Sequence, residues 1–147
     1  MPLLVKKLDP RATVPTCNNP GEDLAYDLYA LEDTLVLSGS VAKLRTGVAL
    51  QHHTPIKAGL LIRDRSSMAA KGLYVAGGVI DAGYTGEVIV LMHYQQGLLE
   101  PQINMYNIKA GDKIAQVIPV PVLTGDVVEV NELSGTRGDK GFGSSGR

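Results

Sequence analysis

Glycine and proline interrupt this chain so often that neither a long helix nor a long strand fits between them. The 147 residues include 17 glycines and 8 prolines, and both residue types break regular secondary structure. Between the interruptions lie short runs rich in Val, Ile, Leu and Tyr, at Leu3–Leu8, Tyr26–Ala30, Thr34–Leu37, Gly47–Gln51, Gly59–Arg63, Leu73–Ala76, Glu87–Tyr94, Lys113–Val120 and Val127–Val130. Short strands at regular spacing with turns between them predict an all-β sandwich or barrel.

Two segments have a more distinctive pattern. Ser66–Gly72 begins with serine, contains helix formers and ends in glycine, which predicts one short helix with a serine N-cap. Val88–Met92 has no polar residue at all, which favours a central strand buried on both faces. In a small domain, such a strand indicates that a partner subunit covers one face.

Length and charge limit the classes of protein that fit. The chain has the length of one domain, which we divide into a β-barrel domain at residues 1–133 and a flexible Gly/Ser-rich arm at residues 134–147. A formal net charge of -1, from 14 basic and 15 acidic residues, gives no reason to expect stable binding to nucleic acid or a membrane. The absence of a signal-peptide pattern and of a bilayer-spanning apolar run leads us to expect a cytoplasmic protein.

Several common catalytic and metal sites are excluded by their missing residues. The single cysteine, Cys17, excludes an internal disulfide and a cysteine-based zinc site. The three histidines, His52, His53 and His93, do not have metal-ligand spacing. There is no P-loop and no Gly-x-Ser-x-Gly nucleophile elbow.

The last fourteen residues, 134–147, have the composition of a phosphate-binding arm. They are rich in glycine and serine and contain two arginines and the chain's only phenylalanine, Phe142. Backbone amides, hydroxyls and the guanidinium of Arg137 suit phosphate oxygens. The ring of Phe142, between glycines where no core holds it, suits stacking on a planar base. A disordered tail without function is the alternative.

A glycine-rich segment, Gly77–Glu87, presents a second candidate site. We expect a β-hairpin whose backbone can approach a ligand closely. Asp81 is a candidate to orient and deprotonate a water, and Tyr84 a candidate to pack against a sugar ring. The alternative is structural, with Asp81 bonding turn amides and Tyr84 packing on the hairpin.

Three further places put polar groups where an anion or metal would bind. Arg65-Ser66-Ser67 precedes the expected helix, where amides and hydroxyls attract anions; an N-cap beside a surface arginine is the alternative. Gln116 lies within an apolar strand, either bonded to a neighbouring backbone or exposed in a site. Asp27 is a similar carboxylate embedded in a strand.

Taken in order, these segments resemble the five motifs of trimeric dUTPases. The matching stretches are Tyr26-Asp27-Leu28-Tyr29-Ala30, Arg65-Ser66-Ser67, Gly78-Val79-Ile80-Asp81 with Tyr84 and Gly86, Gly111-Asp112-Lys113-Ile114-Ala115-Gln116, and Arg137-Gly138 with Gly141-Phe142-Gly143-Ser144-Ser145-Gly146. One such motif is weak evidence, whereas five in the family's order are highly specific.

The resemblance implies a jelly-roll-like distorted β-barrel that forms a homotrimer with three shared active sites. Each site would take Asp81 and Tyr84 from one chain, the Arg65 motif and Gln116 from another, and the arm from the third. The reaction implied is hydrolysis of dUTP to dUMP and pyrophosphate, which keeps uracil out of DNA and supplies dUMP for thymidylate synthesis.

The resemblance also implies a role for each site residue. Asp81 would hold the water that attacks the α-phosphorus in line, and Tyr84 would pack on deoxyribose and exclude a 2′-hydroxyl. Mg²⁺ would bridge the phosphates, with Asp27 in its outer shell through water. The remaining substrate contacts would be Gly78, Val79, Ile80 and Ile89 with uracil, Phe142 capping it, Arg65, Ser66, Ser67 and Gln116 with the inner phosphates, and Arg137, Gly143, Ser144 and Ser145 with the outer ones.

The chain departs from the family pattern at four places. Ala25 stands where glycine is usual, Asp64 where proline is common, and Thr85 where arginine is common. The segment Gln95–Asn107 is longer than expected and is a candidate surface for a protein partner. None of the four removes a residue assigned to chemistry.

Three other functions compete with dUTP hydrolysis. A dCTP deaminase shares the fold and an Arg-Ser-Ser motif but needs a glutamate in the site. A non-catalytic trimer that binds nucleotide and signals through Gln95–Asn107 has no use for Asp81, although catalysis and signalling are able to coexist in one protein. A capsid-like structural jelly roll predicts no phosphate ligands, so the arm argues against it.

Overall fold

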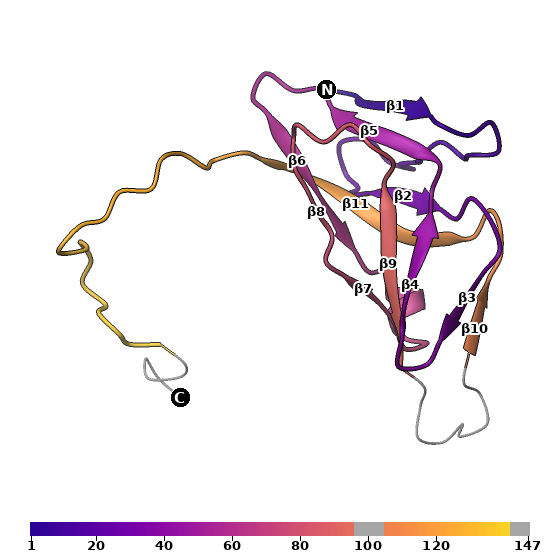
Figure 1. Ribbon diagram of the computed structural model, residues 1–147. Coiled ribbons are helices and arrows are strands. Elements are labelled where there is room, and N and C mark those ends of the chain that lie inside the picture. The colour runs from indigo at the N-terminus through magenta and orange to yellow at the C-terminus, as the bar shows by residue number, and fades with distance from the viewer. Residues whose placement is uncertain (96–104, 142–147) are drawn as a thin grey trace.

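Strands dominate the computed structural model, which describes residues 1–95 and 105–141. Within these ranges lie eleven strands and one helix: β1 (Leu3–Lys7), β2 (Tyr26–Tyr29), β3 (Thr34–Leu37), β4 (Val41–Arg45), β5 (Val48–His52), β6 (Ala58–Arg63), α1 (Ser66–Ala69), β7 (Leu73–Ala76), β8 (Val79–Ile80), β9 (Ile89–Tyr94), β10 (Met105–Ile108) and β11 (Lys113–Pro121). The expected all-β class with one short helix is confirmed (Figure 1). That helix is too short to cross a membrane, and the described residues contain no other.

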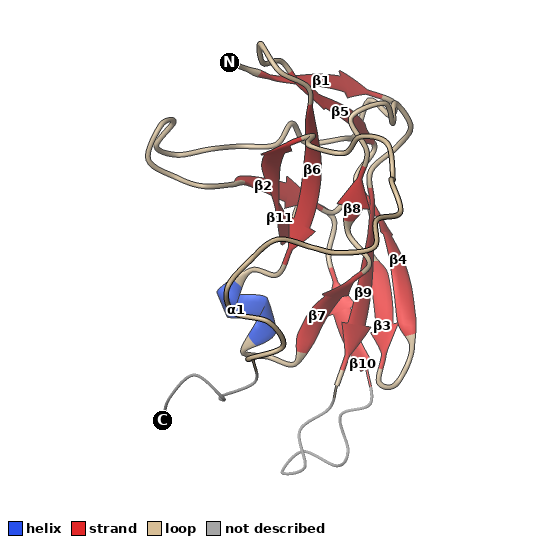
Figure 2. Ribbon diagram, turned by 90° about the vertical axis from the view of Figure 1, so that its left-hand side faces the viewer, coloured by secondary structure: helices blue, strands red, loops and turns tan. Residues whose placement is uncertain are grey.

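The strands form four small antiparallel sheets instead of one closed barrel. The largest has the order β2-β11-β6-β8, and a three-stranded sheet has the order β4-β9-β7. Two pairs, β1 with β5 and β10 with β3, complete the body. Figure 2 shows these sheets facing one another, with α1 at one end of the body. No ladder among the described residues closes the sheets into a barrel.

One apolar core lies between the sheets and draws on almost every strand. The members that are fully or nearly fully buried include Leu28, Val36, Leu44, Leu73, Val88, Val90, Met92, Ile108, Ile114 and Val117. Thr46 is the one buried polar side chain among the described residues, and its hydroxyl donates to the Val88 carbonyl at 2.6 Å. A buried hydroxyl that is bonded in this way escapes the penalty of an unsatisfied polar group.

Most expected strands form within a residue or two of their expected bounds, but the expected strand at Val127–Val130 is wrong. That segment has no strand pairing, since the chain there lies away from the body. Three strands were not expected, namely β4, β8 and β10. β4 contains Ala, Lys and Arg, which have little intrinsic preference for strands, and its pairing with β9 across more than forty residues determines its structure.

The central position expected for Val88–Met92 is confirmed, but its burial differs from the expectation. β9 pairs with β4 on one side and β7 on the other. Within this chain Val90, Met92 and Tyr94 are buried while the alternate residues are half-buried. Cover of the second face by a partner subunit stays a prediction.

The glycine-rich segment Gly77–Glu87 is a connection between sheets, and the expected hairpin is not formed. β8 pairs with β6, whereas β9 belongs to the other sheet. A tight turn closed by the Tyr84 amide and the Asp81 carbonyl, 3.0 Å apart, joins them. The hairpin does not form because β4 and β7 occupy both edges of β9, while β6 pairs with β8.

Helix α1 is shorter than expected and its N-cap is Arg65, with no side-chain cap bond. The serine N-cap expected from the sequence is therefore wrong. The expected glycine stop is present, since Gly72 has φ +85° and its amide bonds to the Ala69 carbonyl at 3.0 Å. A Cβ at Gly72 would lie 2.2 Å from the Gln95 carbonyl oxygen, so the close approach also requires glycine.

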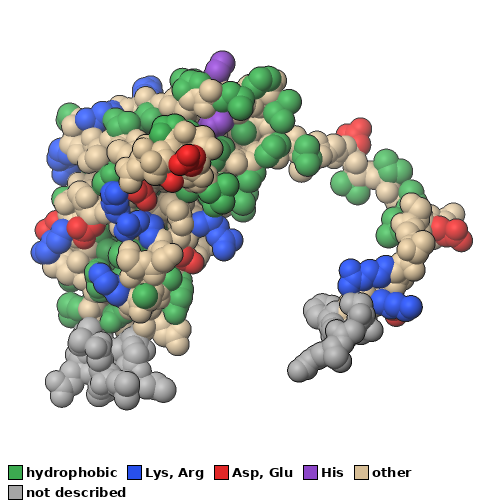
Figure 3. All heavy atoms as spheres, turned by 180° about the vertical axis from the view of Figure 1, so that it is seen from behind, with side chains coloured by type: hydrophobic (Ala, Val, Ile, Leu, Met, Phe, Trp, Pro, Cys, Tyr) green, Lys and Arg blue, Asp and Glu red, His purple; other side chains and the backbone are tan. Residues whose placement is uncertain are grey.

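After β11 the chain leaves the body as an arm, here defined as residues 122–141. In Figure 1 the arm runs away from the sheets. Figure 3 shows hydrophobic side chains along it and basic ones toward the end of the described segment. Leu123, Val127 and Leu133 are each about nine-tenths exposed or more. The division between a domain at 1–133 and an arm at 134–147 stays a prediction.

We predict that Gly72→Ala destabilises the protein far more than Gly111→Ala. Both glycines have positive φ, which costs a non-glycine residue roughly 1–2 kcal/mol. Only Gly72 also faces a backbone oxygen, while a Cβ at Gly111 meets open space, so Gly72→Ala should cost roughly 1–3 kcal/mol more. Urea unfolding at one fixed protein concentration measures both. Equal losses would contradict the packing account.

Candidate functional site

A cleft of about 260 Å³ lies where β8 meets the start of β9. Its lining contains six of the residues singled out from the sequence, Gly78, Val79, Ile80, Asp81, Tyr84 and Ile89, together with Ile62, Glu87, Val88 and Leu91. The structure thus brings together every site residue expected from the third motif. The cleft has an apolar floor and a carboxylate and a phenol on its rim, which suits a flat ring attached to a polar group.

The Tyr84 ring is held in a defined position at this cleft. Its hydroxyl donates to the Glu87 carbonyl at 2.8 Å. The ring lies against Gly86, where a Cβ would come within 2.6 Å of the tyrosine oxygen. The packing role considered for Tyr84 is therefore confirmed, yet 47% of the residue is exposed, so the ring also presents a face to a ligand.

Asp81 is exposed at the end of β8, where its carboxylate is free to meet a ligand. Within residues 1–95 and 105–141 its side chain makes no hydrogen bond, and only its backbone carbonyl closes the turn. The alternative in which the carboxylate bonds turn amides is therefore not observed. The backbone here is fixed by the Leu60–Ile80 pairing to β6. A carboxylate on a paired strand end is well placed to hold a small polar molecule such as water.

A second cluster forms around Asp27 on β2. The carboxylate lies 3.0 Å from the Lys113 ammonium and 3.4 Å from Arg65 Nε. Arg65 Nη1 also donates to the Lys113 carbonyl at 3.2 Å and to the Ser67 hydroxyl at 3.4 Å. One acid thus lies between two bases, which leaves one positive charge uncompensated and makes the cluster attractive to anions.

Gln116 joins this cluster through the register of β2 and β11, which places it directly opposite Asp27. Its amide donates to the Asp64 carbonyl at 2.7 Å, so the backbone-bonded alternative is confirmed. Its side chain nonetheless lines a pocket of about 240 Å³ together with Asp27, Cys17 and Asp23. The Asp64 carboxylate accepts a hydrogen bond from the Val75 amide. The aspartate that stands where the family commonly has proline therefore makes a structural contact.

Asp81 and the Arg65 motif lie toward opposite ends of β6, although the cleft itself reaches Ile62 near the Arg65 end. Asp81 is close to Gly59, since a Cβ there would touch the Ile80 carbonyl at 2.9 Å. Arg65 follows the other end of the strand at Arg63, about 13 Å away along an extended chain. The two pockets share no lining residue. Within one chain, Asp81 and the Arg65 motif therefore do not line a common pocket.

The remaining expected residues lie apart from both clusters or outside the described residues. Arg137 is on the arm, where its Nε donates to the Lys140 carbonyl at 2.7 Å. Phe142, Gly143, Ser144 and Ser145 lie outside the described residues, as does most of the Gln95–Asn107 segment.

Sequence reasoning missed two residues, Lys113 and Glu87. Lys113 belongs to one of the matching motifs, but its partner could not be read from the sequence. Only the antiparallel pairing of β2 with β11 places it beside Asp27. Glu87 is the last residue of the glycine-rich segment, but nothing in its sequence context indicated the partners of its carboxylate.

The carboxylates suit a magnesium ion that is held mainly by its ligand. Among the described residues no three His, Cys, Asp or Glu side chains form a metal cage. Mg²⁺ commonly keeps its waters and binds one or two carboxylates plus substrate phosphates. Asp27, in a polar pocket beside two bases, provides a single carboxylate of this kind.

Comparisons with known proteins agree on one family. The family model for dUTPase matches residues 11–146. A deoxyuridine 5′-triphosphate nucleotidohydrolase of Picosynechococcus sp. is 37% identical over 150 residues, which cover 99% of this chain and 99% of that protein. A mutant dUTPase of Staphylococcus bacteriophage 80alpha, solved with dUpNHpp, has a TM-score of 0.85 and 27% identity, with 99% of each chain covered.

A second phage structure bears on metal binding. A mutant dUTPase of phage phi11 of S. aureus has a TM-score of 0.76 and 26% identity, covering 90% of this chain and 98% of that one. That structure reveals the coordination of a structural Mg(II) ion in the phage protein.

The Asp27 cluster yields a testable prediction about anion binding. Asp27→Asn removes the negative charge that lies between Lys113 and Arg65, so inorganic pyrophosphate should bind about two- to fivefold more tightly in the presence of a chelator, the range expected for partly exposed charge pairs. Isothermal titration calorimetry measures the affinity.

Asp33→Asn is the matched control, because Asp33 pairs with Lys109 at 3.9 Å away from the cluster and should leave the affinity unchanged. Weaker pyrophosphate binding by Asp27→Asn would show that Asp27 orders the two bases instead of neutralising them.

Proposed function

Because this chain belongs to the dUTPase family and hydrolyses dUTP to dUMP and pyrophosphate, we propose that its two clusters divide the substrate between two subunits. The likeness to phage dUTPases also confirms the expected jelly-roll type of fold. In this proposal the cleft at β8 holds deoxyuridine, and the Asp27 cluster of a neighbouring chain holds the phosphates. The observation that supports the division most strongly is the separation of the two clusters along β6.

The nucleoside half of the site is the cleft lined by Gly78, Val79, Ile80 and Ile89. Its volume of about 260 Å³ lies just below the usual range for a small-molecule pocket, which fits a pyrimidine with its sugar. Exposed backbone groups beside the glycines provide donors and acceptors for the uracil edge. Tyr84 packs against the deoxyribose and leaves no room for a 2′-hydroxyl.

Asp81 holds the attacking water at the rim of the cleft. Its carboxylate is exposed and unbonded within the described residues, so one oxygen is free to accept a proton from the water while the strand end fixes its direction. The water attacks the α-phosphorus in line, and the bond to the pyrophosphate oxygen breaks. Positioning and charge neutralisation supply most of the rate enhancement in such reactions.

The phosphate half consists of Arg65, Ser66, Ser67 and Gln116 of a neighbouring subunit. Arg65 and Lys113 provide positive charge, and the serines and amides at the start of α1 provide donors. Mg²⁺ bound beside Asp27 would neutralise the phosphate chain. Asp27 is then shared between the outer shell of that ion and the two bases.

The arm of the third subunit, together with the residues that follow it to Arg147, completes the site in this proposal. Arg137 binds the outer phosphates, together with Gly143, Ser144 and Ser145, and Phe142 covers the uracil. The exposed apolar residues of the arm, such as Leu123 and Val127, support a partner surface along its path. A homotrimer is the smallest assembly that provides three such sites with equivalent chains.

The test is pyrophosphate release from dUTP, dTTP, dCTP and UTP, with Mg²⁺ and with chelator. We expect Mg²⁺-dependent cleavage selective for dUTP, and a loss of about 10²–10⁴-fold in kcat for Asp81→Asn, the range for a lost general base. Asp33→Asn should keep full activity. Unchanged kcat in Asp81→Asn would contradict the proposed role of Asp81. Tight binding of dUTP without turnover by the wild type would instead favour a nucleotide-binding module, and release of ammonia from dCTP a deaminase.

A further inference from the structure

The residue that accepts the Tyr84 hydrogen bond is itself anchored on both sides. Glu87 C=O and Val88 N–H belong to one planar peptide unit. The carbonyl accepts from Tyr84 at 2.8 Å, and the amide donates to the Val48 carbonyl at 2.8 Å. One rigid peptide unit therefore connects the tyrosine hydroxyl to β5.

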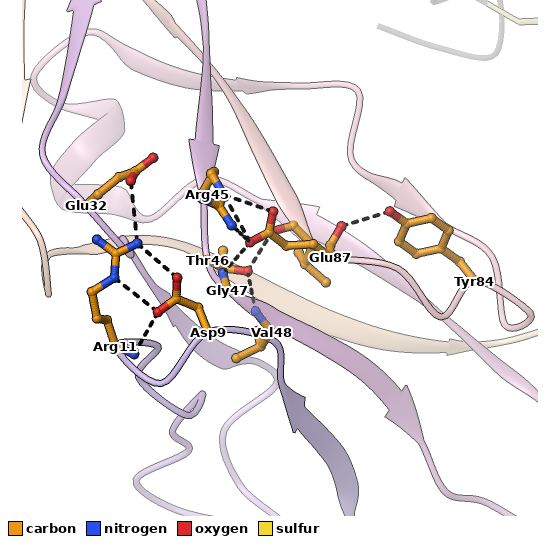
Figure 4. A network of polar contacts seen from close by, with 10 residues as sticks. Asp9, Arg11, Glu32, Arg45, Thr46, Gly47, Val48, Tyr84 and Glu87 are labelled. Atoms are coloured by element: carbon orange, nitrogen blue, oxygen red, sulfur yellow. Dashed lines mark hydrogen bonds and ion pairs between the residues drawn. The ribbon is translucent and has the colours of Figure 1, made fainter.

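The carboxylate of Glu87 ties the same unit to the turn between β4 and β5. Its two oxygens accept from Arg45 Nε at 3.2 and 3.3 Å, and Oε1 also accepts from Arg45 Nη2 at 3.2 Å and from the Gly47 amide at 3.0 Å. Figure 4 shows these hydrogen bonds to the Glu87 carboxylate and the separate bond from the Tyr84 hydroxyl. The Glu87 side chain is only 19% exposed, so water competes weakly for its oxygens.

The residues around Arg45 are held in place by their contacts with the buried core. Thr46, next to Arg45, is buried and bonds through its hydroxyl to the Val88 carbonyl at 2.6 Å. Arg45 is the last residue of β4 and pairs with Ile89 of β9, itself a lining residue of the cleft. The Glu87 carboxylate raises the pKa of Arg45 further above its ordinary value, so the guanidinium remains charged.

We propose that Glu87 and Arg45 are positioning residues for substrate selection, because together they set how far the Tyr84 ring stands from the sugar. This inference rests on the proposed function, in which Tyr84 excludes a 2′-hydroxyl. Arg45 does not line the cleft, and Glu87 lines it while its carboxylate is bonded to Arg45 and to the Gly47 amide. They act through the 87–88 peptide unit, whose direction fixes the tyrosine hydroxyl and, with Gly86 beneath it, the plane of the ring.

A small displacement of the Tyr84 ring would change the discrimination between deoxyribose and ribose. The ring is half-exposed and has no other hydrogen bond among the described residues, so release of its acceptor lets it swing away from the cleft. A ribose then fits where only a deoxyribose fitted, and the deoxyribose loses its packing surface. A misplacement of about 1 Å can change a rate by about 10²-fold, so a partial displacement of the ring predicts about a tenfold change.

The experiment compares kcat and KM for dUTP and UTP in the full-length wild type and in variants of the pair. We expect Glu87→Met to lower the ratio of kcat/KM for dUTP to that for UTP by about tenfold, mainly by raising KM for dUTP. Arg45→Met should lower the ratio less, by about threefold, because the Gly47 amide still holds the carboxylate and Arg45 is partly exposed. Glu87→Gln, which keeps an oxygen acceptor, should retain most of the selectivity.

A matched ion pair and a double-mutant cycle separate positioning from general stability. Arg11→Met breaks a nearby, similarly exposed pair with Asp9 at 2.9 Å that has no bond to Tyr84, and should leave the ratio unchanged. In a Tyr84→Phe background, Glu87→Met should have little further effect, because the shared bond is already gone.

Two results would overturn the inference. One is a Glu87→Met protein that melts at a lower temperature but keeps its dUTP to UTP ratio. The other is a loss of selectivity that is fully additive with Tyr84→Phe. A wild type that does not discriminate dUTP from UTP would instead remove the proposed role of Tyr84, and the inference with it.

Discussion

The pairing of β6 with β11 on one edge and β8 on the other determines the rest of the site. Its β8 edge fixes the backbone from Gly78 to Asp81 and so forms the floor and rim of the cleft. Its β11 edge brings Gln116 opposite Arg63, while β2 on the far side of β11 places Asp27 opposite Gln116. The Arg65 motif continues from the end of β6, at the opposite end from Asp81. The same strand thus positions both halves of the proposed site and separates Asp81 from the Arg65 motif within one chain, which supports the proposal of a site between subunits.

Local sequence patterns were sufficient for the strand-rich class and for most strand positions, because alternating apolar runs and glycine turns act over a few residues. The residues of the third motif are contiguous, so their meeting in one cleft could also be predicted. Strand β4 could not be predicted, because its residues have little intrinsic preference for strands and its partner β9 lies far along the chain. The same is true of Lys113, Arg45 and Glu87, whose partners are set by strand register. The hairpin and the strand at Val127–Val130 failed for a related reason: local pattern indicates that a segment is able to form a strand, but the available edge decides whether and where it pairs.

Tyr84 and Asp27 illustrate how one side chain is able to combine a structural contact with the ligand-binding role proposed for it. Tyr84 bonds to the Glu87 carbonyl and still exposes a face to the cleft. Asp27 pairs with Lys113 and Arg65 and still lines a polar pocket. In each case the structural contact fixes the orientation of the group before a ligand arrives, which lowers the entropic cost of binding. The structural and functional alternatives considered for these residues are therefore compatible.

Subunit complementation tests the shared site most directly. Asp81→Asn and Arg65→Ala chains should each form inactive homo-oligomers, since each lacks one half of every site. Co-expression in equal amounts and purification of the mixed oligomers should restore activity in about one third of the sites, because each mixed trimer has one intact cleft beside an intact phosphate cluster among its three sites. Activity in the mixed oligomers that does not exceed that of the two parent variants would contradict the account and locate both halves of the site in one chain.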